Sequence, residues 1–107
     1  MLESDRELWE ILVPTARNSG KPFRTRHHRE WDKQVYKITG GLTIYQPAKG
    51  KWVSPRGQLF QDRVIPVRVA CLESDIEKIL EITLKHYDQE AVMAYRVSER
   101  VLIKHRE

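Results

Sequence analysis

The sequence has 107 residues, a length that fits one compact domain and is too short for two independent hydrophobic cores. Hydrophobic residues make up 40% and charged residues 32%, a balance that excludes a membrane-embedded or compositionally disordered chain. The net charge of +4 favours anionic partners, but nucleic-acid binding also requires the charge to gather on one surface. We therefore expect one domain spanning residues 1–107, in a cytoplasmic protein with no membrane segment.

The first elements in the chain are a strand and a helix. Residues 8–13 are rich in strand formers and end at Pro14, which predicts the first strand. Trp31, Val35 and Ile38 then recur at helical spacing, and a pair of glycines after residue 39 supplies a stop. The pattern predicts a helix over Thr25–Thr39.

The middle of the chain reads as strands and turns. A short strand over residues 42–45 is followed by turns at residues 47–50 and 54–57, which enclose residues 51–53 as an inserted hairpin. Residues 64–71 form a strand with two mostly apolar faces, in which Pro66 lacks a ladder donor and requires a bulge or an open side. The only cysteine, Cys71, excludes an internal disulfide and is expected to be a buried thiol.

The last third of the chain predicts a second helix and two further strands. Ser74-Asp75-Ile76-Glu77 fits a capping box, so we expect this helix to start at Ser74. Its apolar side consists of Ile76, Ile79, Leu80, Thr83 and Tyr87. Residues 91–97 and 100–104 then read as strands.

This order predicts an α+β fold, a ferredoxin-like split βαβ sandwich with an antiparallel sheet, two helices on one face and an inserted β-hairpin. The opposite face is too apolar to be left in water, so we expect a homodimer or a higher homo-oligomer. The residues expected on that face are Leu8, Glu10, Leu12, Val64, Arg68, Ala70, Val92, Ala94 and Arg96.

The strand order and the expected open sheet face resemble those of the dimeric α+β barrel group of ferredoxin-like proteins. More narrowly, Gly41-Leu42-Thr43 followed by Gly50-Lys51-Trp52, together with the segment Tyr87-Asp88-Gln89-Glu90-Ala91-Val92, is similar to a pattern in small bacterial and phage proteins. The resemblance implies the fold and a dimer. It implies no activity, because no active-site signature of the barrel enzymes is present.

A basic cluster at the start of the first helix is one candidate binding site. Arg24, Arg26 and Arg29 lie where backbone N–H groups already favour an anion, and arginine suits phosphate and carboxylate. Tyr45 and Trp52 of the hairpin segment could stack on the ring of a ligand. A solvated basic surface and core positions for the two aromatic residues are the alternatives.

Two further arginines, Arg68 and Arg96, interrupt an apolar strand pattern. A buried arginine needs a partner, and Glu10 on the same expected face could supply a structural or interface ion pair. The alternative is that these arginines bind the carboxylate or phosphate of a ligand.

The histidines His27 and His28 are candidates for proton transfer or metal binding. Adjacent helical residues point about 100° apart, so these two cannot hold one ion without partners from elsewhere. His28 could instead pair with Asp32, either as a boundary histidine held by a carboxylate or as an acid-base pair. We expect neither a metal nor a cofactor.

The function that these residues favour is non-enzymatic binding of a phosphate-bearing small molecule such as a nucleotide. One alternative is a small enzyme that uses His28 and Asp32 with arginine clamps. The other is nucleic-acid binding through the basic hairpin and the helix start. No phosphate loop, paired-cysteine zinc pattern or nucleophile elbow is present.

Overall fold

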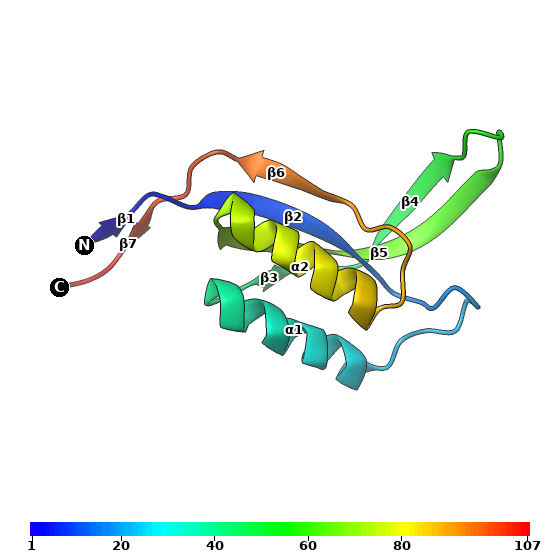
Figure 1. Cartoon of the computed structure of the whole chain (residues 1–107), viewed down its shortest axis with the longest axis horizontal. Coiled ribbons are helices and arrows are strands. Elements are labelled where there is room, and N and C mark those ends of the chain that lie inside the picture. The colour runs from blue at the N-terminus through cyan, green and yellow to red at the C-terminus, as the bar shows by residue number, and fades with distance from the viewer.

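The computed structural model describes residues 1–107 and has two helices packed on one face of an antiparallel sheet (Figure 1). The sheet has five strands in the order β3-β5-β2-β6, with β4 paired to the outer part of β5. The strands are β2 (Glu7–Pro14), β3 (Thr43–Ile44), β4 (Ala48–Val53), β5 (Leu59–Cys71) and β6 (Ala94–Ser98). The helices are α1 (Thr25–Thr39) and α2 (Glu73–His86). The α+β ferredoxin-like fold expected from the sequence is confirmed.

The two ends of the chain form a separate small sheet that the sequence did not predict. Strand β1 (Leu2–Glu3) pairs with β7 (Ile103–Lys104) in an antiparallel ladder, which places both termini together at one end of the molecule (Figure 1). The strand expected over residues 100–104 is therefore reduced to two residues and pairs outside the main sheet. Strands this short leave no period-two pattern, so sequence reasoning could not find their pairing.

The helices cover the sheet with the stripes that their periodicity predicts. Helix α1 has the predicted bounds, and it ends where Gly40 adopts a left-handed φ of 83° and donates its N–H to the Tyr36 carbonyl at 2.8 Å. The indole of Trp31 is buried between the helices and donates to Thr83 Oγ1 at 3.0 Å. The buried apolar core consists of Ile11, Val13, Trp31, Val35, Val67, Val69, Cys71, Ile76, Ile79 and Tyr87.

The start of α2 corrects the capping-box prediction. The N-cap residue is Leu72, no side chain caps the helix, and Ser74 lies in the first turn. Strand β5 runs to Cys71, so the chain passes into the helix through a single residue. Glu73 and Asp75 nevertheless place negative charge in the first turn, where the helix dipole favours it.

Strand β5 is longer than predicted, and its outer half forms a two-stranded ribbon with β4. Residues 48–50, which were expected to form a turn, instead pair with residues 62–64 of β5. Three residues, Tyr45–Pro47, connect β3 to β4, whereas only two residues of β5, Ile65 and Pro66, lie opposite them. The pairing with β5 therefore shifts by one residue between β3 and β4. Pro66, which has no backbone N–H to donate, lies at this irregularity, in agreement with the bulge or open side expected from the sequence.

Strand β6 faces the opposite way from the prediction. Ala94 pairs with Ile11 and packs on the core, together with Val92, while Arg96 pairs with Trp9. These residues therefore lie on the helix side, and Tyr95 is the residue opposite Glu10. Both faces of this strand carry apolar residues, so its sequence pattern does not fix which face is inward.

No helix of the structure is long and apolar enough to cross a membrane. The cytoplasmic location stays a prediction.

Candidate functional site

A cavity of about 470 Å³ lies between the small terminal sheet, the C-terminal end of α1 and the open face of the main sheet. The α1 end contributes Thr39, Gly40, Gly41, Leu42 and Thr43, and the main sheet contributes Leu8, Arg68 and Ala70. The remaining lining residues are Glu3, Arg6, Ile103 and His105. The walls therefore combine apolar side chains with charged and hydroxyl groups.

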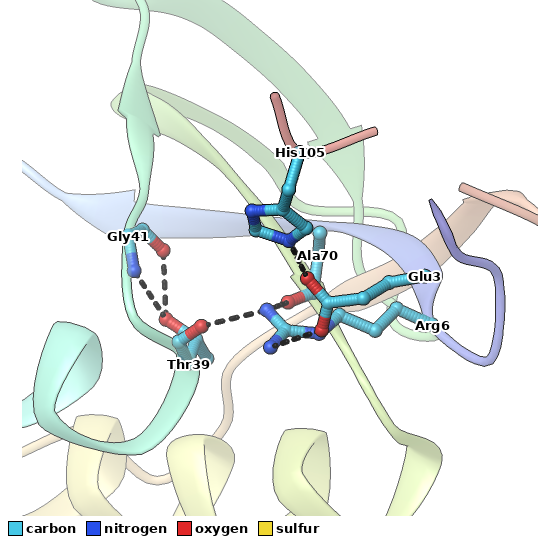
Figure 2. Close-up of polar contacts among 6 residues, drawn as sticks. All are labelled: Glu3, Arg6, Thr39, Gly41, Ala70 and His105. Atoms are coloured by element: carbon cyan, nitrogen blue, oxygen red, sulfur yellow. Dashed lines mark hydrogen bonds and ion pairs between the residues drawn. The ribbon is translucent and has the colours of Figure 1, made fainter. Parts of the chain in front are cut away.

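Arg6 ties together the elements that surround this cavity (Figure 2). Its Nη1 donates to the Thr39 carbonyl at 2.9 Å and to the Ala70 carbonyl at 3.4 Å, so one guanidinium joins the end of α1 to β5. A cation at the C-terminal end of a helix also meets the negative end of the helix dipole. Its Nη2 lies 3.5 Å from Glu3 Oε1. Arg6 therefore has a structural role as well as a place in the wall.

Glu3 is held ionised at the edge of the cavity. His105 Nε2 lies 2.6 Å from Glu3 Oε2 (Figure 2). The hydrogen bond from His105, together with the positive charges of Arg6 and His105, lowers the pKa of Glu3. The cavity wall thus carries a negative group as well as the positive charge of Arg68.

The end of α1 is locked by Thr39. Its Oγ1 lies 2.7 Å from the Gly41 carbonyl and accepts the Gly41 N–H at 3.3 Å (Figure 2). The backbone that follows the helix is therefore held in a defined turn where it lines the cavity.

Arg68 brings the expected ion pair to the open sheet face. Its Nε donates to Glu10 Oε1 at 2.9 Å, and the ring of Tyr45 lies 5.1 Å from its guanidinium carbon. Tyr95 donates its hydroxyl to the other oxygen of Glu10. The hydrogen bond to Glu10 raises the pKa of Arg68. Hydrogen bonds within the chain use only Nε, which leaves Nη1 and Nη2 available to a ligand.

Arg96 does not share this site. It pairs with Glu7 at 2.8 Å rather than with Glu10, because β6 presents it to the helix side of the sheet. The expectation of a common partner for Arg68 and Arg96 is therefore wrong.

The basic cluster of α1 lies outside the cavity. Arg24, Arg26 and Arg29 are exposed, and Arg26 forms an exposed ion pair with Glu30 at 3.4 Å. None of these arginines lines the cavity described above, and neither does Tyr45 or Trp52. Of the predicted binding residues, only Arg68 lines it.

The β4–β5 ribbon separates its basic residues from its aromatic residues. Lys49 and Lys51 alternate along β4 with Trp52, and Lys49 lies opposite Arg63. Trp52 stacks on Phe60 at 4.6 Å between ring centroids, on the other face of the ribbon. Nucleic-acid binding through the hairpin stays a prediction, with its cationic and stacking groups on opposite faces.

His28 and Asp32 do not form the expected pair. His28 Nδ1 lies 2.7 Å from Tyr87 Oη. Burial, and then the nearby charges of His27 and His86, lowers the pKa of His28, while burial raises the pKa of Asp32. Burial also raises the pKa of Tyr87. We interpret this group as packing between the helices.

Sequence reasoning missed Glu3, Arg6, Thr39 and His105. Glu3, Arg6 and His105 belong to the terminal segments, which meet only in the folded chain. Thr39 was recognised only as the last residue of a helix. No local motif links these positions.

No protein-family model and no curated protein sequence matches the chain significantly. A phage SAM lyase in complex with S-methyl-5′-thioadenosine is similar in structure, with a TM-score of 0.69 and 13% identity over 98% of this chain and 94% of that one. The periplasmic divalent cation tolerance protein CutA of Archaeoglobus fulgidus has a TM-score of 0.63 and 8% identity, over 86% of this chain and 81% of that one. The divalent cation tolerance protein Cut A1 of Thermus thermophilus has a TM-score of 0.57 and 16% identity, over 95% of this chain and 85% of that one. At these identities the likeness shows a shared fold.

Proposed function

We propose that this chain binds an anionic, nucleotide-like small molecule in the cavity beside Arg68, without converting it. The observation that carries the proposal is a cavity of about 470 Å³ in which Arg68 keeps two terminal nitrogens free of protein partners. Small-molecule sites commonly occupy about 300–1,000 Å³ and combine apolar walls with a few placed polar groups. The cavity has this size, and 4 of its 12 lining residues are hydrophobic.

The lining divides into parts that suit the parts of a nucleotide. Leu8, Leu42 and Ile103 offer apolar surface to a base, and Glu3 can accept hydrogen bonds from ribose hydroxyls. Arg68 can form a bidentate contact with a phosphate or carboxylate. The proposed binding site for the anionic group is therefore on the sheet face, and no longer at the arginines of α1.

The fold comparison supports an adenosine-bearing ligand. The phage SAM lyase, which has the same fold over nearly the whole of both chains, holds S-methyl-5′-thioadenosine. Adenosine is also part of AMP and of S-adenosylmethionine, so these compounds test one class of ligand with different charged groups.

Isothermal titration calorimetry with adenosine, AMP and S-adenosylmethionine tests the proposal. AMP should bind more tightly than adenosine to the natural chain, and Arg68→Gln should remove most of that difference. Arg96→Gln, which breaks an ion pair outside the cavity, is the matched control and should preserve it. Binding of none of the three, or an AMP preference that survives Arg68→Gln, would contradict the proposal.

An enzyme acting on the same ligand is the second candidate, favoured by the likeness to a lyase. An enzyme would convert the ligand into a product, whereas a binding protein would release it unchanged. Incubation with S-adenosylmethionine followed by chromatography should show no loss beyond that of a protein-free control if the chain is a binder. Accumulation of S-methyl-5′-thioadenosine faster than in that control would identify an enzyme.

We also propose that the chain acts as a homodimer or a higher homo-oligomer. The open sheet face carries four partly exposed apolar residues that form two cross-strand pairs. Leu8 of β2 lies opposite Ala70 of β5, and Leu12 lies opposite Pro66. Glu10 and Arg68 are paired at its centre, so the face can be covered without leaving either charge unpartnered. Leu8, Arg68 and Ala70 of this face also line the cavity, so a second copy placed there would help to enclose it.

A further inference from the structure

A second cluster of chemically active side chains lies at the opposite end of the helices from the cavity. His27 belongs to the first turn of α1, Glu30 follows it three residues later, and His86 is the last residue of α2. One ring nitrogen from each histidine and one carboxylate oxygen of Glu30 lie within 4.8 Å of one another. The fold thus supplies His27 with the partners from elsewhere that the sequence alone lacked.

Hydrogen bonds fix the proton on each of the two rings. His27 Nε2 lies 2.6 Å from the His86 carbonyl oxygen, and His86 Nε2 lies 2.7 Å from the His27 carbonyl oxygen. A carbonyl oxygen only accepts, so each Nε2 is the N–H donor and each neutral ring keeps its lone pair on Nδ1. Gln34 Nε2, 3.2 Å from His86 Nδ1, donates to that lone pair.

The same hydrogen-bond pattern is typical of histidines that bind metals. Such a histidine usually donates its second ring N–H to a carbonyl or carboxylate, which orients the ring and increases the basicity of the ligating nitrogen. Here both rings already have that second contact. They are also held by stacking, His27 on His86 at 4.0 Å and Phe23 on His27 at 5.0 Å between centroids.

We propose that His27, Glu30 and His86 form a binding site for a divalent transition-metal ion such as Zn²⁺. Two imidazole nitrogens and a carboxylate oxygen are ligands that this class of ion accepts, with a fourth position left for water. The ion would join the start of α1 to the end of α2 and add to the contacts that already hold the two helices together.

Arg26 competes with the metal for Glu30. Its Nε lies 3.4 Å from Glu30 Oε1, in an ion pair whose arginine side chain is 91% exposed. Exposed pairs of this kind contribute little to stability, so an ion can displace Arg26 at small cost. The proposal therefore makes opposite predictions for the two partners: Glu30→Gln should weaken metal binding, and Arg26→Ala should strengthen it.

Calorimetry of untagged protein with ZnCl₂ near neutral pH tests the site, with circular dichroism to verify that each variant is folded. We expect one ion per chain, an affinity at least about tenfold lower in Glu30→Gln and in His86→Ala, and a higher affinity in Arg26→Ala. Lys33→Ala, an exposed change on the same helix, should have no effect. Glu30 is exposed, so its variant decides the question even if His86→Ala does not fold.

Absence of zinc binding would overturn the proposal, as would an affinity that Glu30→Gln leaves unchanged. His105 and Glu3 form the other histidine–carboxylate contact in the chain. Zinc binding that is lost in His105→Ala and retained in Glu30→Gln would place the ion there and would equally reject the site between the helices.

Discussion

Glu10 is a nearly buried carboxylate that lies between Arg68 of one neighbouring strand and Tyr95 of the other. Removing Arg68 would deprive this carboxylate of one of its two partners. Because Glu10 is buried, water could not fully replace the lost hydrogen bond. Arg68→Ala should therefore lower the free energy of unfolding. Urea denaturation measures the loss. The same experiment on Arg96→Ala should give a smaller loss, because that pair is more exposed. Equal losses in the two variants would contradict this expectation.

His28 makes the stability of the fold depend on pH. Burial and the charges of His27 and His86 lower its pKa from the ordinary value of 6.5. The unfolded chain therefore takes up this proton at a higher pH than the folded chain, so the stability contributed by neutral His28 is lost as the pH falls below 6.5 and through the folded pKa.

Chemical denaturation between about pH 5 and pH 7 checks this effect. The free energy of unfolding should fall toward the acidic end, and His28→Gln, which cannot titrate, should show a shallower fall. An identical pH dependence in the variant would show that His28 does not carry the effect.

At the scale of elements, α2 begins without a side-chain cap. Ser74 lies inside the first turn and makes no capping hydrogen bond, so Ser74→Ala should change the free energy of unfolding by less than about 0.5 kcal/mol. A true cap would cost about 0.5–2 kcal/mol. The midpoint of urea denaturation distinguishes the two values, and a loss of about 1 kcal/mol or more would restore the capping box.

The elements with strong internal periodicity could be predicted from sequence. Helix α1 has the expected bounds because its apolar stripe and its terminal glycine agree. The start of α2 was misplaced because the capping-box pattern alone does not show whether the serine lies before the first turn or, as here, within it. The side toward which β6 faces and the pairing of β1 with β7 depend on contacts between distant segments, which local patterns do not record.

The candidate site was less predictable than the fold for the same reason. Arg68 was recognised because it interrupts an apolar strand, and its pairing with Glu10 is present. The arginines at the start of α1 were favoured by charge and by the helix dipole, but these features describe an exposed helix start equally well. Arg6 and His105 contribute through the meeting of the two termini.

At the scale of the whole molecule, the uncovered sheet face predicts self-association. Light scattering should give a mass of at least two chains at micromolar concentration, because Leu8, Leu12 and Ala70 are partly exposed in the single chain and an assembly would remove them from water. Leu12→Glu should shift the protein toward the monomer by placing an unpaired charge in the interface. A stable monomer of the natural chain would contradict the covered face.

Binding of an adenosine-bearing ligand in the cavity beside Arg68 can be followed residue by residue with backbone amide NMR during a titration with AMP. The amide signals of Gly40, Gly41, Thr43 and Ala70, which line the cavity, should move in a saturable way, while those of residues 24–29 should stay in place. Movement confined to residues 24–29 would return the anion site to the start of α1. An unchanged spectrum at millimolar AMP would contradict nucleotide binding by this chain.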